Sequence, residues 1–203
     1  MEPLLSDLLR AETRQAHHAL DHHPALNSLV AAGIDTQTYR SSLESLYRSW
    51  APLETAIEQG LEHFSSAVGK GENGESVDLL CFCVDHYSPR RYALERDLQR
   101  LGASPDRSGR VRFRFRFSTL SELVGGLYVY FGAQMGGKFI AAHLARIIPN
   151  VPTEYFESTH SELGKFWLTF RHLLDGFSES AEVRKAAVQS ANRVFEVFRI
   201  ELG

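Results

Sequence analysis

The stretch FGAQMGG, residues 131–137, places three glycines in seven positions of a segment whose apolar spacing otherwise predicts an α-helix. Each glycine inside a helix costs about 1 kcal/mol relative to alanine. Gly132 and Gly136 are four residues apart and therefore share one face of the helix, and Gly137 adjoins them. A strip without Cβ atoms lets another helix or a flat ligand approach the backbone, and it also permits a kink. The stretch therefore predicts either close helix packing or one wall of a binding site.

The rest of the chain also shows mainly helical periodicity. The glycine-rich helix should begin at Thr119, which stands in capping-box spacing with Glu122, and end near Ile148, before Pro149. Other helices are expected at about 4–21, from 35 or 36 onward with a kink or break at Pro52, and at about 76–87, 90–101, 154–174 and 180–201. A loop at 69–74, a turn at 104–109 and an extended connector at 110–117 separate them. We therefore expect an all-α multi-helix bundle that forms a single domain over residues 1–203.

Composition excludes several classes of protein. A hydrophobic fraction of 43% and a charged fraction of 23% are ordinary for a soluble globular protein. The net charge of -3 gives no general attraction to nucleic acid or to an anionic membrane, and no apolar run reaches the ~20 residues of a membrane span. The N-terminal sequence mixes acidic and basic residues among the apolar ones, unlike a signal peptide. Cys81 and Cys83 are the only cysteines and are expected to be free thiols in a reducing cytoplasm.

The first helix contains RAETRQAHHALDHH, residues 10–23, with four of the nine histidines. A helical wheel places Leu5, Leu9, Ala16 and Leu20 on one buried stripe. His17 lies at the margin of that stripe, beside Thr13, whereas His18 lies nearly opposite and should face solvent. His17 is therefore the histidine best placed to reach a pocket from a packed helix.

Arg10, Arg14 and Asp21 adjoin His17 on the wheel. The group could be a histidine at a helix interface whose hydrogen bonds are made within the protein, beside arginines that face solvent. Two further interpretations are a metal shared by His18 and His22, four residues apart, and phosphotransfer through an exposed His18. A histidine that faces the glycine strip across a bundle could also hold a planar metallocofactor, with a gap for a small gas on the glycine side.

Several motifs, in order along nearly the whole chain, resemble the heme oxygenase family and its bacterial branch. RAETRQAH (10–17) has the threonine four positions before the axial histidine, and YVYFGAQMGG (128–137) has a tyrosine followed by Gly-x-x-x-Gly-Gly. The other similar stretches are YRSSLESLYRSWAPLE (39–54), RYALERDLQRLG (91–102), FWLTF (166–170) and ANRVFEVF (191–198).

The resemblance implies that heme b lies between the first helix and the kinked glycine-rich helix, with His17 as the axial ligand of the iron. The other residues that it assigns to heme contact are Thr13, Arg10, Arg14, Tyr130, Ala133 and Arg171, the three arginines as partners of the propionates. Gly132, Gly136 and Gly137 would form the catalytic distal surface. Asp21 is the expected acceptor for the His17 ring N–H, with Glu12 as a competitor.

The family reaction implies that heme is opened to biliverdin, with release of carbon monoxide and ferrous iron, using dioxygen and an external electron donor. A ferredoxin-like protein or a flavoprotein reductase would supply electrons, and a photoreceptor could accept the biliverdin. The connector RVRFRFRF is either a docking site for an acidic donor or, in the simpler interpretation, a solvated segment with its aromatic rings in the core.

Ala133 departs from the family, because animal members carry an aspartate at this position that holds distal water. Gln134 is a candidate replacement if its side chain points inward. The departure keeps open a protein that binds or senses heme without cleaving it.

Overall fold

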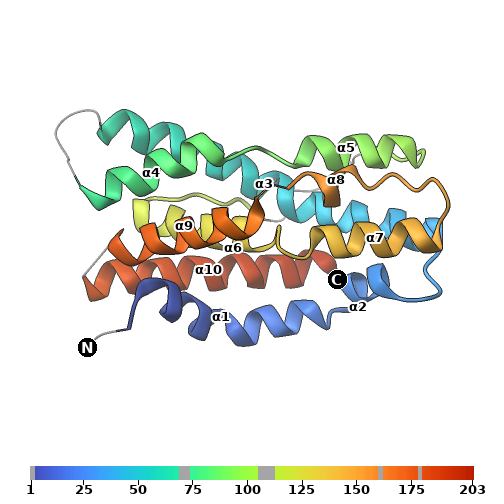
Figure 1. Ribbon diagram of the computed structural model, residues 1–203, viewed down its shortest axis with the longest axis horizontal. Helices are drawn as coiled ribbons and strands as arrows, with labels where there is room; N and C mark the ends of the chain where they lie inside the picture. The colour runs from blue at the N-terminus through green and yellow to red at the C-terminus, as the bar shows by residue number, and fades with distance from the viewer. Residues whose placement is uncertain (1–2, 69–73, 105–112, 160–161, 178–179) are drawn as a thin grey trace.

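The computed structural model describes residues 3–68, 74–104, 113–159, 162–177 and 180–203, and every regular element within these ranges is a helix (Figure 1). The helices are α1 (Leu5–Asp21), α2 (Pro24–Asn27), the 3-10 helix η1 (Ser28–Val30), α3 (Thr36–Val68), α4 (Glu75–His86), α5 (Arg91–Arg100), α6 (Leu120–Gly132), α7 (Gly137–Ile147), α8 (Glu154–Glu157), α9 (Leu163–Phe177) and α10 (Ala181–Leu202). The all-α prediction is confirmed.

The long C-terminal helix α10 lies between α1 and α6 and packs against α6, α1 and α3 (Figure 1). Helices α6 and α10 approach closely at Gly125, where an added Cβ would lie 2.1 Å from the carbonyl oxygen of Ala187. Only a residue without a side chain allows these two helices to approach so closely. The contact fixes α6, and with it the glycine-rich segment, relative to the core.

A kink or a break was predicted at Pro52, and helix α3 continues through this residue without a break. Proline in a helix interior removes one hydrogen bond and costs about 3 kcal/mol. Trp50, Leu53 and Ile57, on either side of the proline, are buried in the core. Packing on both sides of Pro52 keeps the helix continuous.

The segment expected to be one helix over 119–148 is divided into α6 and α7. Thr119 caps α6 as predicted, because its hydroxyl accepts the backbone N–H of Glu122 at 3.2 Å. The residues between the two helices form i→i+3 hydrogen bonds instead, including Met135 N–H to the Gly132 carbonyl and Gly137 N–H to the Gln134 carbonyl. The glycine stretch therefore interrupts the helix completely.

The helix expected over 154–174 is also divided, into α8 and α9. The buried carboxylate of Asp97, on α5, accepts the backbone N–H groups of Glu154 at 3.2 Å and Tyr155 at 2.9 Å. This contact fixes the start of α8 against α5. Ser158, with a ψ of 72°, then ends α8 after one turn.

The connector between α5 and α6 is extended over 113–117, as predicted, with Phe115 buried and Arg114 and Arg116 exposed. The ring of Phe117 lies where a Cβ on Gly126 would be, 2.5 Å away. Arg110 and Arg112, the turn at 105–109 and the loop at 69–73 lie outside the described residues. In the described parts of the chain, none of the helices has the length and apolar character that crossing a membrane requires.

Candidate functional site

A cavity of about 1210 Å³ lies between α1 and the interruption between α6 and α7. Its lining also includes residues from α3, α8, α9 and α10. The volume exceeds the roughly 300–1,000 Å³ of common small-molecule sites, so a large ligand fits. The predicted site residues among the lining are Arg10, Thr13, Arg14, His17, Gly132, Ala133, Gly136, Gly137 and Arg171.

His17 lines the cavity from the exposed side of α1, with 61% of its side chain accessible. Its Nδ1 lies 2.8 Å from Oδ2 of Asp21, one turn further along the helix. The imidazole edge also meets the ring of Phe195 on α10, with centroids 5.8 Å apart. If Nδ1–H donates to the carboxylate, the lone pair of Nε2 is left for a ligand.

The cations of the site lie along the same stretch of α1 and on α9. Arg10 and Arg14 are exposed and line the cavity. Arg171 lines it from α9, where its guanidinium donates to the Asp7 carboxylate at 3.0 Å and to the Ser6 hydroxyl at 3.2 Å. The cavity lining here therefore carries three guanidinium groups beside two carboxylates, Asp7 and Asp21, and the guanidinium groups of Arg10 and Arg14 could pair with an anionic ligand.

Thr13 is buried where α1 lines the cavity. Its hydroxyl donates to the Leu9 carbonyl at 2.7 Å, within the helix. Tyr128, on α6, lies close to it. Burial raises the pKa of the Tyr128 phenol, while a hydrogen bond with Thr13 and the charges of Arg171 and Arg10 oppose the rise. Thr13 of α1 and Tyr128 of α6 both line the cavity.

The three predicted glycines have different surroundings. A Cβ on Gly136 would meet no atom within 4 Å, and one on Gly132 would make ordinary contact with Trp167 at 3.5 Å. A Cβ on Gly137 would lie 2.5 Å from the carbonyl oxygen of Phe156. Gly136 therefore leaves bare backbone at the cavity, whereas Gly137 allows α7 and α8 to pack closely. None of the three has a positive φ.

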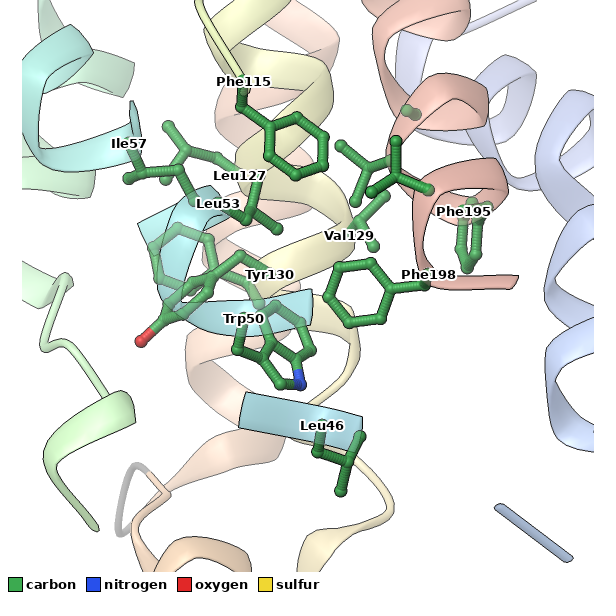
Figure 2. Packing of buried hydrophobic residues seen from close by; sticks show 14 of the residues in the cluster. Leu46, Trp50, Leu53, Ile57, Phe115, Leu127, Val129, Tyr130, Phe195 and Phe198 are labelled. Carbon is green, nitrogen blue, oxygen red and sulfur yellow. The ribbon is translucent and has the colours of Figure 1, made fainter. Parts of the chain in front are cut away.

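Tyr130 is the one predicted contact residue that does not line the cavity. Its side chain is 1% exposed, and its hydroxyl donates to the Ser88 carbonyl. Figure 2 shows the ring beside Trp50, with the hydroxyl directed away from Phe198. A step of two residues along a helix is a rotation of about 200° around its axis, so the two tyrosines point in nearly opposite directions. Tyr128 faces the cavity and Tyr130 faces the core.

Gln134 is buried, at 3% exposure, but it does not line the cavity either. In a continuous α-helix, the Ala133 carbonyl would accept the backbone N–H of Gly137. Here that N–H donates to the Gln134 carbonyl instead. Ala133 itself is on the lining. The side chain expected to compensate for Ala133 is therefore directed elsewhere.

Sequence reasoning missed the apolar walls of the cavity. They include Trp50 on α3, Trp167 on α9, and Phe195 and Phe198 on α10. Aromatic residues at helical spacing are indistinguishable in the sequence from ordinary core residues. Only the space left by the interruption between α6 and α7 makes them part of a site.

His18 is exposed, as the wheel predicts, and reaches the rim of the cavity. Its ring stacks on that of His22, with centroids 4.1 Å apart, and the His22 Nδ1 lies 2.9 Å from the His18 carbonyl. Stacked rings do not converge on one metal ion. Among the described residues, no group of three or more His, Cys, Asp or Glu side chains is arranged to hold a metal.

A family model described as heme oxygenase matches residues 4–69 and 84–201 of this chain. The fold is similar to that of heme oxygenase from Leptospira interrogans, with a TM-score of 0.72, 18% identity and 98% coverage of both chains. It is also similar to the NO- and CO-bound heme oxygenase of Neisseria meningitidis, with a TM-score of 0.71, 19% identity, and 99% of this chain and 91% of that chain covered. Heme oxygenase-1 of the cyanobacterium Synechocystis, in complex with heme, has a TM-score of 0.65 at 17% identity over 98% of this chain and 91% of that one. A sequence search of curated proteins gives no match.

Proposed function

The chain belongs to the heme oxygenase family, and from this premise we propose that it is a heme-degrading oxygenase that converts heme b to biliverdin, carbon monoxide and ferrous iron. The observation that carries the proposal is one cavity with His17 on α1 and the bare backbone of Gly136 on the opposite wall. When bound, the heme would supply the iron that binds dioxygen and accepts electrons from an external donor. The donor would be a ferredoxin-like protein or a flavoprotein reductase.

The residues of the cavity fit heme in three respects. His17 offers an imidazole whose orientation Asp21 fixes, which suits an axial ligand. Arg10, Arg14 and Arg171 offer guanidinium groups for two carboxylates. The apolar walls suit the faces of a porphyrin.

The wall formed by Gly132, Ala133 and Gly136 would leave space above the ring without offering an acidic side chain. A wall of this kind restricts by steric contact how a small ligand lies over the porphyrin. It also excludes bulk water from that side. These tasks need close backbone rather than a catalytic side chain, which agrees with Gly136 facing open space.

The direct test adds hemin to the purified protein and follows the absorption spectrum. A Soret band shows binding, and subsequent supply of ascorbate, or of ferredoxin with its reductase, should convert the spectrum to that of biliverdin. A protein that forms no Soret complex would contradict the proposal at its first step.

A heme-binding protein that does not cleave heme is the second candidate, and Ala133 favours it. Its methyl group on the lining cannot hold water through a hydrogen bond. In the same experiment, this candidate gives a Soret band that persists under reductant and oxygen. Delivery of biliverdin to a photoreceptor belongs to the first candidate only.

A further inference from the structure

Asp7 places a carboxylate in the part of the cavity where the proposed function requires cations. It lines the cavity from the first turn of α1, and its carboxylate pairs with Arg171 of α9. A ligand carboxylate that needs the same guanidinium is repelled by Asp7, because like charges at short distance repel each other. Arg171 is therefore available to an anionic ligand only if its pair with Asp7 can open.

The contact with Asp7 uses only one end of the Arg171 guanidinium. Nη2 of Arg171 donates to Oδ1 of Asp7 at 3.0 Å and to Oγ of Ser6 at 3.2 Å. Nε and Nη1 have no hydrogen-bond partner among the described residues, so three of the five N–H donors of the group are left over. A second carboxylate can pair with these donors while Asp7 is still in contact.

The start of α1 does not depend on this ion pair. Leu4, the N-cap residue, makes no side-chain cap hydrogen bond, and Oδ1 of Asp175 accepts the backbone N–H of Ser6 at 2.9 Å. The side chains of Arg171 and Asp7 are 32% and 56% exposed, and ion pairs as exposed as this one contribute little to stability. The pair can therefore open without releasing α1 from α9.

We propose that Asp7 competes with a carboxylate of the bound ligand for Arg171 and thereby speeds the release of that ligand. The inference rests on the proposed function, because it takes the ligand to be heme or its open-chain product. Opening the ring at a meso carbon leaves both propionate groups in place, so heme and biliverdin offer the same carboxylates to Arg171. As one of these carboxylates leaves, Asp7 takes its place, and the guanidinium always has a partner of opposite charge.

The first experiment measures how fast bound hemin leaves, by stopped-flow transfer to excess apomyoglobin. Asp7→Asn, at an exposed position, should keep the fold and slow the dissociation of hemin about two- to fivefold, the range expected for an exposed ion pair. Asp7→Glu keeps the charge and should release hemin nearly as fast as the wild type. Unchanged dissociation in Asp7→Asn would overturn the proposal, and so would faster dissociation, which would mean that Asp7 positions Arg171 for the ligand.

A double-mutant cycle tests whether Asp7 acts through Arg171. Arg171→Met removes the guanidinium, and in this background Asp7→Asn should no longer alter the dissociation rate. Glu182→Gln is the matched control, because Glu182 carries the same charge, is exposed in the first turn of α10 and does not line the cavity. Equal slowing by Glu182→Gln, or slowing by Asp7→Asn that persists without Arg171, would reduce the effect to net charge and overturn the proposal.

Biliverdin is the second probe, since it keeps the carboxylates and holds no iron. Its release, followed by stopped-flow transfer to serum albumin, should be slowed by Asp7→Asn by a similar factor. Slower release of hemin without slower release of biliverdin would contradict competition for the carboxylate. A wild-type protein that binds neither probe would refute the proposed function and this inference with it, whereas normal binding without an effect of Asp7 would refute the inference alone.

Discussion

His17 satisfies two requirements of an axial ligand that oppose each other. The imidazole must be accessible to a ligand, and 61% of the His17 side chain is accessible. It must also be held in one orientation, which the 2.8 Å contact with Asp21 and the edge contact with Phe195 achieve. Because Asp21 follows His17 by four residues, the helix itself brings the pair together.

Removing the His17 imidazole should abolish axial ligation while the fold stays intact, because the side chain is exposed rather than part of the core. His17→Ala is expected to weaken hemin binding about tenfold or more and to stop turnover, and added imidazole should restore the ligated spectrum. His63→Ala, an exposed histidine on α3, is the control. An unchanged spectrum in His17→Ala would show that another residue ligates the iron.

Asp21 should act as a positioning residue for His17. Asp21→Asn keeps the size of the side chain but removes the charge that makes the imidazole a stronger donor to iron. Partners of metal-bound histidines typically contribute roughly 10–100-fold to metal affinity or activity. The iron–histidine stretching frequency of the ferrous complex should fall in Asp21→Asn and recover in Asp21→Glu, whereas a purely structural role would leave it unchanged.

At the scale of elements, the glycine stretch serves two different purposes. Gly137 makes room for the Phe156 carbonyl, and Gly136 faces open space. Helix packing therefore explains Gly137, whereas Gly136 has the open space that approach of a ligand would need.

This difference predicts opposite outcomes for two neighbouring substitutions. Gly137→Ala should destabilise the protein by about 1–3 kcal/mol, because its Cβ would lie against backbone that cannot easily move. Gly136→Leu should change the free energy of unfolding by less than about 1 kcal/mol, but it should block hemin binding by filling the cavity. Urea unfolding and a hemin titration of both variants measure the two effects, and a Gly136→Leu protein that binds hemin normally would mean that the stretch serves packing only.

The elements that the sequence predicted well are those whose signals are local. The Thr119 cap and the margin position of His17 depend on residues within one or two turns. The placement of the start of α8 depends on Asp97, 57 residues before Glu154, so no local pattern could reveal it. Tyr130 does not line the cavity for another reason: a family motif gives the order of residues, but the rotation along α6 decides that Tyr128, and not Tyr130, faces the cavity.

At the scale of the whole molecule, the cavity lies among helices that are distant in sequence. Residues from α1, α3, α6, α7, α8, α9 and α10 contribute to its lining. A ligand in the cavity would contact several of these helices at once. A bound ligand should therefore stabilise the entire bundle rather than one helix.

Hemin should accordingly raise the thermal stability of the protein. A ligand present at 100 times its dissociation constant stabilises the native state by about 2.7 kcal/mol, which corresponds to a rise in Tm of roughly 5–11 °C for a chain of this length. Hydrogen exchange should slow in α1 and in the turn between α6 and α7, the two walls that would face the porphyrin. Gly136→Leu is the matched control, because it keeps the fold but closes the space. Hemin that merely adheres to the surface would stabilise both proteins equally, and that result would refute binding between these walls.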